Sequence, residues 1–269
     1  MKFPAIFFVT IRLSFRARYI GLVLFSVVFL SLAVLLGAQF AGRQPATVAL
    51  DVGISIIRLL LPFVVVMLTQ ELLSNEFERR YFLSSLSYPY TRLSWLWGRF
   101  FAVTVLIFGL LCLLAILLSV LVRLAGEGYV QSTPVDLVGG YLITMGFIAL
   151  DLLVLTALSS FLALTASTSS FVLVGTFGFM LVARSFAAII ELLARDSSVV
   201  SNAESYGSGV GLLAYLLPDL GALDVRGVSL YGQMEFLPVD WPWLLMSCLI
   251  YAFALMALAV WAFNRKRFV

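Results

Sequence analysis

The 269-residue sequence has no histidine, only two cysteines, and charged residues at 12% of its positions. Without histidine, the chain lacks the commonest metal ligand and the commonest general acid–base group. Cys112 and Cys248 both fall inside apolar runs, which favours a packing role over a disulfide or metal framework. No P-loop, zincin or nucleophile-elbow motif occurs either. We therefore expect no catalytic residue, cofactor-binding residue or metal site in this chain.

Apolar residues are abundant instead. They make up 62% of the sequence, and the mean hydropathy is +1.09. A soluble domain carries roughly 45–50% apolar and about 25% charged residues, so this composition indicates a membrane protein. The net charge of +3 does not indicate nucleic-acid binding, because the basic residues gather on one predicted side of a membrane.

Crossing the hydrocarbon core takes about 20 mainly apolar residues in a helix. Segments of this length occur at residues 19–38, 50–72, 100–122, 137–161, 171–190 and 241–263. The sequence thus predicts an all-α membrane protein, a single transmembrane domain over residues 1–269 with six transmembrane helices.

Lysine and arginine set the expected orientation, because they are enriched in cytoplasmic loops. Most of the 17 basic residues fall on one side of the predicted spans: Lys2, Arg12, Arg16, Arg18, Arg79, Arg80, Arg92, Arg99, Arg265, Lys266 and Arg267. The other side holds Arg43, Arg123, Arg195 and Arg226. We expect a multi-pass protein of a bacterial cytoplasmic (inner) membrane, with both termini in the cytoplasm.

Two further segments flank the spans. Residues 1–18 alternate basic and apolar groups and predict a helix lying in the inner membrane interface, with Phe3, Phe7 and Ile11 toward the acyl chains. A frayed basic tail is the alternative. Residues 191–240 predict an outer loop with a polar first half and an apolar second half that suits short helices, too small to be a domain of its own.

A charged insertion, ELLSNEFERRYFLSSLSYPYTRLSWLWGRF, occupies residues 71–100 between the second and third spans. It predicts a cytoplasmic helix at residues 74–90 that Pro89 ends. Its mixed charges suit a protein partner better than an anionic lipid surface. A helix held between two spans can pass a force to both of them. An ordinary solvated loop helix is an equally good interpretation of these residues.

The insertion resembles the signature of type-2 ABC exporter permeases. The resemblance rests on Glu71, Glu76, Glu78, Leu83, Leu86, Ser87, Pro89, Arg92, Gly98 and Arg99. Arg79 and Arg80 stand where the family often has Gly-Thr, and Arg99 stands where it often has lysine. Within the family, the chain is similar to the branch named for multi-copper-enzyme maturation, although the absence of histidine argues against direct copper or haem ligation.

This resemblance implies a permease that moves its substrate by alternating access. ATP and Mg²⁺ would be bound by a separate cytoplasmic ABC ATPase in two copies, and a second permease subunit would complete a homodimer in the bilayer. Residues 76–87 would form the coupling helix. The ATPase-coupling residues implied are Glu76, Phe77, Glu78, Arg79, Arg80, Leu83, Ser87, Pro89 and Arg92. A membrane assembly or scaffold protein without transport activity is the alternative function, and a membrane-embedded enzyme is a less supported one.

Three charged residues lie inside predicted spans: Arg58, Asp151 and Arg184. A lone charge at the bilayer centre costs roughly 2.5–3.5 kcal/mol on insertion scales, so these side chains should face the protein interior and pair. We expect one polar cluster in which Asp151 pairs with one arginine or both. A fixed interhelical ion pair and a switch on a substrate path both fit this pattern. Pro62 should loosen the second span.

Overall fold

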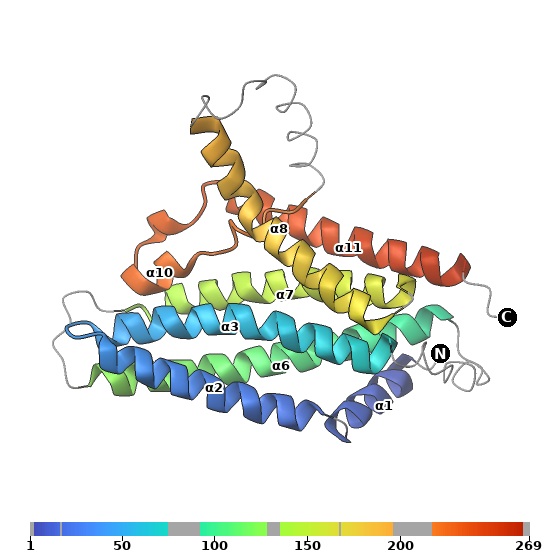
Figure 1. Cartoon of the computed structure of the whole chain (residues 1–269), viewed down its shortest axis with the longest axis horizontal. Coiled ribbons are helices and arrows are strands. Elements are labelled where there is room, and N and C mark those ends of the chain that lie inside the picture. Colours follow the sequence, from blue (N-terminus) through green and yellow to red (C-terminus); the bar gives the residue numbers. More distant parts are fainter. Residues whose placement is uncertain are drawn as a thin grey trace.

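The computed structural model describes residues 3–16, 18–74, 92–127, 135–166, 168–195 and 217–265. Every regular element within these ranges is helical. Long helices run back and forth along one bundle, and both chain termini lie at the same end of it (Figure 1). We call this the termini end and the other the distal end.

The helices are α1 (Phe3–Arg16), α2 (Tyr19–Phe40), α3 (Pro45–Thr69), α6 (Arg92–Gly126), α7 (Gly139–Thr165), α8 (Ser169–Arg195), α10 (Arg226–Tyr231) and α11 (Trp241–Arg265). A π-helical turn, η1 (Gln70–Ser74), continues α3, and a 3₁₀ turn, η2 (Met234–Phe236), precedes α11. The predicted fold class, an all-α membrane protein, is confirmed in this coarse form.

Five helical segments are long and apolar enough to cross a membrane: Tyr19–Phe40, Pro45–Leu73, Leu93–Gly126, Gly139–Thr165 and Trp241–Arg265. Each overlaps a predicted span. α8 covers the predicted span 171–190, and its residues Ser169–Ser185 form an apolar helix too short by themselves to count as a span. The count of six spans therefore stays a prediction.

The core lies between α3, α6 and α7. α3 buries most of its length, whereas α2 buries little beyond Ser26, Leu30 and Val34 and leaves an apolar outer surface, as lipid exposure requires. Gly53 of α3 permits a close approach, because a Cβ there would lie 2.2 Å from Cδ1 of Leu118 on α6.

α1 is a helix packed against α6 rather than a frayed tail. Its buried face is Ile6, Thr10 and Ser14, whereas Arg12 and Arg16 are exposed. Ile6 fits over Gly98 of α6, where a Cβ would meet its Cγ2 at 2.9 Å. The face predicted to lie in the acyl chains, around Phe7 and Ile11, is thus half-buried at the edge of this contact.

The distal end is covered by residues 217–240, which include α10 (Figure 1). The short helix expected in the apolar half of the outer loop does not extend through 217–225. Pro218 lacks an amide donor, and the Asp219 carboxylate accepts a hydrogen bond from the Ala222 amide at 3.0 Å, so the chain turns there. Asp136 ends the neighbouring loop by accepting hydrogen bonds from Val138, Gly139 and Gly140 at the start of α7.

Candidate functional site

A chain of ion pairs runs from the interior of the bundle to its distal end. We call it the charge network, and it consists of Asp51, Ser55, Arg58, Asp151, Arg184, Asp224 and Arg226. It joins α3, α7 and α8 to the segment that carries α10. Its side chains are 1% exposed at the inner end, at Asp151, and 47% exposed at the outer end, at Asp51.

The inner part of the network contains the three intramembrane charges singled out from the sequence. Asp151 Oδ2 lies 2.5 Å from Arg184 Nη2, so α7 is paired with α8. Arg184 Nη1 also donates a hydrogen bond to the main-chain carbonyl of Arg58 at 3.1 Å. Asp151 therefore pairs with one of the two arginines, and Arg58 contributes its carbonyl to the contact.

Pro62 explains why that carbonyl is open to Arg184. In a helix the amide of residue 62 would donate to the carbonyl of residue 58, but proline has no N–H. α3 continues through Pro62, and Arg184 supplies the missing donor from α8. The proline thus creates a polar attachment point in the middle of an apolar helix.

The outer part of the network pairs α3 with residues from the predicted outer loop. Arg58 Nη1 lies 2.5 Å from Asp224 Oδ2, and Arg58 Nη2 reaches the Leu220 carbonyl at 3.4 Å. Arg226 binds Asp224 at 2.6 Å and Asp51 at 3.0 Å, and it donates to Ser55 Oγ at 2.8 Å. Two arginines thus converge on the Asp224 carboxylate.

The electrostatics of the outer part follow from this geometry. Burial alone would raise the pKa of Asp224, but the hydrogen bonds from Arg226 and the positive charges of Arg58 and Arg226 outweigh it and hold the pKa below its ordinary value of 3.8. The hydrogen bonds to Asp224 and Asp51 raise the pKa of Arg226 despite partial burial. Asp224 and Arg226 are therefore both charged at neutral pH.

The network retains unused hydrogen-bonding capacity. Among the described residues, Asp151 Oδ1 and Arg184 Nε are buried and have no hydrogen-bond partner. A buried polar atom without a partner costs free energy, so these atoms can gain from a different arrangement of the same helices.

A second polar cluster, the termini-end junction, lies where α3 ends. Thr69 and Ser159 of α7 share a hydrogen bond of 3.0 Å, and Gln70 Nε2 donates to the Ser169 carbonyl at the start of α8 at 2.6 Å. Arg99 of α6 donates to the Leu72 carbonyl in η1. The junction therefore bonds the end of α3 to α7, and η1 to α6 and α8.

Arg99 also connects the junction to the last helix. Its guanidinium lies 4.5 Å from the ring centre of Trp95, which stacks on Phe263 of α11 with centroids 5.5 Å apart. Arg99 is buried, with 7% of its surface exposed. The arginine that carries part of the family resemblance is thus a packing and hydrogen-bonding centre.

The predicted coupling residues fall on a different part of the chain. Glu76, Phe77, Glu78, Arg79, Arg80, Leu83, Ser87 and Pro89 lie outside the described residues, and Arg92 is the first residue of α6. The coupling helix at 74–90 stays a prediction. Its two attachment points, η1 and the start of α6, are described and lie at the termini end.

The chain matches no protein-family model and no curated protein.

The sequence analysis does not identify Asp224, Arg226 and Asp51 as members of the charge network, because these residues lie in predicted loops or near the end of a predicted span. One signal was present: Pro62 stands four residues after Arg58 and marks its carbonyl as an open acceptor.

Proposed function

We propose that the chain is the membrane-spanning permease subunit of an ATP-driven ABC exporter, powered by a separate cytoplasmic ATPase. The substrate moves by alternating access through a homodimer of the chain. The observation that carries this proposal is that the two described elements flanking residues 75–91, η1 and the start of α6, are bonded to each other and into the bundle. A protein that docks on this segment acts on α3 and α6 directly.

The route from that segment to the distal end is continuous. η1 is bonded to α6 by Arg99 and to the start of α8 by Gln70, and η1 continues α3. Farther along α3, Arg58 holds Asp224 of the distal segment and its carbonyl holds Arg184 of α8. A displacement of α3 should therefore also move the distal segment. Alternating access requires such coupled movement of the two ends.

The charge network also favours transport over a purely structural role. Ionisable groups within membrane spans often mark transport paths. Here they connect α3, α7, α8 and the distal segment rather than a single pair of helices. The unused atoms Asp151 Oδ1 and Arg184 Nε leave room for a second pairing scheme.

The test is purification of the full chain in mild detergent, identification of any bound nucleotide-binding subunit, and measurement of ATP hydrolysis by that complex in lipid nanodiscs. We expect an ATPase with a phosphate-binding loop to stay bound in equal stoichiometry and to hydrolyse ATP. Arg99→Gln should leave that subunit bound but lower its coupled hydrolysis severalfold. The matched control is Arg12→Gln, an exposed arginine on α1 at the same end.

Two outcomes count against the proposal. Retention of membrane partners without any ATPase supports the scaffold alternative instead. The assigned route of coupling is contradicted if Arg99→Gln leaves ATP hydrolysis unchanged while Arg12→Gln lowers it.

A further inference from the structure

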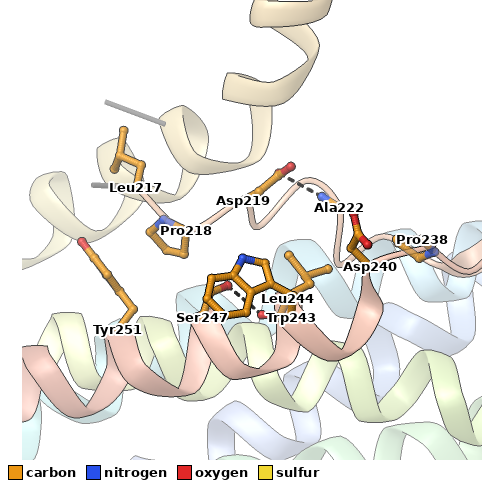
Figure 2. A pocket seen from close by; sticks show the side chains of 10 residues that line it. All are labelled: Leu217, Pro218, Asp219, Ala222, Pro238, Asp240, Trp243, Leu244, Ser247 and Tyr251. Carbon is orange, nitrogen blue, oxygen red and sulfur yellow. Dashed lines mark hydrogen bonds between the residues drawn. The ribbon is translucent and has the colours of Figure 1, made fainter. Parts of the chain in front are cut away.

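A pocket of about 370 Å³ lies between the distal segment and the first turns of α11 (Figure 2). Its walls come from the turn at 217–222, from residues 238–240 and from one face of α11. The lining residues are Leu217, Pro218, Asp219, Ala222, Pro238, Asp240, Trp243, Leu244, Ser247 and Tyr251. This volume is within the range of small-molecule sites.

The charged residues that line the pocket are both acidic. Asp219 and Asp240 bring carboxylates to it, and none of the described residues that line it is basic. Asp219 Oδ1 accepts the hydrogen bond from the Ala222 amide that shapes the turn. Within the part of the chain that the structure describes, neither carboxylate forms a salt bridge.

The surrounding charge reinforces this imbalance. Of the charged residues in 217–240, Asp224 and Arg226 are already matched by each other and by Arg58 and Asp51. The charges left over within this segment, those of Asp219, Glu235 and Asp240, are all negative. The pocket therefore offers a negative potential to whatever enters it.

The rest of the lining is aromatic and apolar. Trp243 is 73% exposed and lies on the floor of the pocket beneath the 217–222 turn, as Figure 2 shows. Tyr251 borders it farther along α11, and its ring stacks on Phe179 of α8 with centroids 5.9 Å apart. An indole face attracts cations, and Leu217, Pro218 and Leu244 offer contact to an apolar body.

We propose that this pocket binds an amphipathic organic cation, with its ammonium between the carboxylates and Trp243 and its apolar part against the leucines. Two carboxylates with an exposed indole suit an ammonium group better than an anion. Among the described residues, no group of three or more Asp, Glu and Cys residues has metal-binding geometry. The ammonium belongs either to a lipid headgroup or to a soluble amine. This inference goes beyond the proposed function, and its test needs no ATPase.

The test uses the full chain purified in dodecylmaltoside, which is uncharged. The probe is 4-(4-dimethylaminostyryl)-N-methylpyridinium, a fluorescent cation, and binding is followed by fluorescence anisotropy. The neutral 4-dimethylaminostilbene has a closely similar body without the charge. We expect at least about tenfold tighter binding of the cation, since each exposed carboxylate contributes about threefold to fivefold.

Variants locate the site. Asp219→Asn and Asp240→Asn should each weaken cation binding about threefold to fivefold, and the double variant roughly tenfold. Glu235→Gln is the matched control: it removes the same charge from the same segment at an exposed position outside the pocket, and it should change affinity less than about twofold. Trp243→Leu should weaken the cation more than the neutral probe.

Added lipid separates the two sources of the ammonium. Competition by phosphatidylethanolamine, but not by phosphatidylglycerol, assigns the site to a lipid headgroup. Absence of competition by either lipid assigns it to a soluble amine. Equal affinity for both probes overturns the proposal. So does an unchanged affinity of the double variant when its thermal unfolding matches that of the wild-type chain.

Discussion

Arg184 makes two interactions at once, and replacing it with methionine removes both while keeping a similar length. Removing one partner of a buried ion pair costs about 3–5 kcal/mol. Arg184 is 20% exposed, which favours the lower end, about 3 kcal/mol. Hydrogen bonds between membrane helices contribute on average about 0.6 kcal/mol, so losing the bond to the Arg58 carbonyl adds roughly that amount. We expect Arg184→Met to lower the free energy of unfolding by about 3.5 kcal/mol.

Two companion variants separate these contributions. Asp151→Asn removes the charge that Arg184 neutralises, so the Asp151→Asn/Arg184→Met double variant should lose less than the sum of the single losses, by about 1.5 kcal/mol or more. Pro62→Ala restores an amide donor four residues after Arg58. In the wild-type chain Arg184 already donates to the Arg58 carbonyl, whereas in the Arg184→Met chain that carbonyl has lost its donor. The effect of Pro62→Ala on the free energy of unfolding should therefore be more favourable in the Arg184→Met chain, by about 0.6 kcal/mol or more.

The two cysteines supply the assay. Cys248 is buried and Cys112 is exposed, so a Cys112→Ala background leaves a thiol that reacts with a dye only on unfolding. Titrating dodecylmaltoside micelles with sodium dodecyl sulfate and following Cys248 labelling then yields the free energy of unfolding. Strict additivity of Asp151→Asn and Arg184→Met would falsify the ion pair. An equal effect of Pro62→Ala in both backgrounds excludes the carbonyl contact.

Three further predictions use the same assay or a simple change of pH. Gly53→Ala should destabilise the fold by about 1–3 kcal/mol, because its Cβ meets Leu118, whereas Gly109→Ala, with open space around it, should cost nothing. The pKa of Asp224 lies below 3.8 in the folded chain, so its stabilising effect is present at neutral pH and is lost as the pH falls below about 4. The protection of the amides of residues 217–231 against hydrogen exchange, taken relative to the intrinsic exchange rate at each pH, should fall there and stay constant from pH 5 to 8. Backbone hydrogen bonds from Gly140 and Val138 lower the pKa of Asp136, so Asp136→Ala should cost about 1 kcal/mol at pH 7 and less below pH 4.

The sequence was most informative about elements that follow from apolar length alone. Five predicted spans coincide with helices because about 20 apolar residues leave a membrane chain few other conformations. The depth of Arg58, Asp151 and Arg184 was also predictable, since it follows from counting residues along a helix. What required the structure was the identity of the partners.

Asp224 illustrates why those partners could not be predicted. It lies in a loop more than 160 residues from Arg58, and nothing in its local sequence distinguishes it from Asp219 or Asp240. Its position depends on how the chain returns over the distal end, where Gly140 and Gly221 let main chain approach main chain. A Cβ at Gly221 would lie 2.6 Å from the Arg184 carbonyl oxygen, and one at Gly140 would lie 2.6 Å from that of Val228. Such contacts are fixed by tertiary packing, which the span pattern does not encode.

α3 and its continuation η1 are bonded to α8 at two places, and this constrains how the proposed permease can move. Gln70 holds the start of α8, and the Arg58 carbonyl holds Arg184 twelve residues away along α3, about 18 Å at helical rise. The two helices should therefore shift together unless one of these bonds breaks, and Asp224 should follow through Arg58. Ala222 lies in the pocket wall, close in sequence to Asp224. The labelling rate of a cysteine substituted for Ala222 should then differ between the ATP-bound and the nucleotide-free complex. The same substitution in an Asp224→Asn chain should lose most of that difference, because the connection between α3 and the distal segment is weakened.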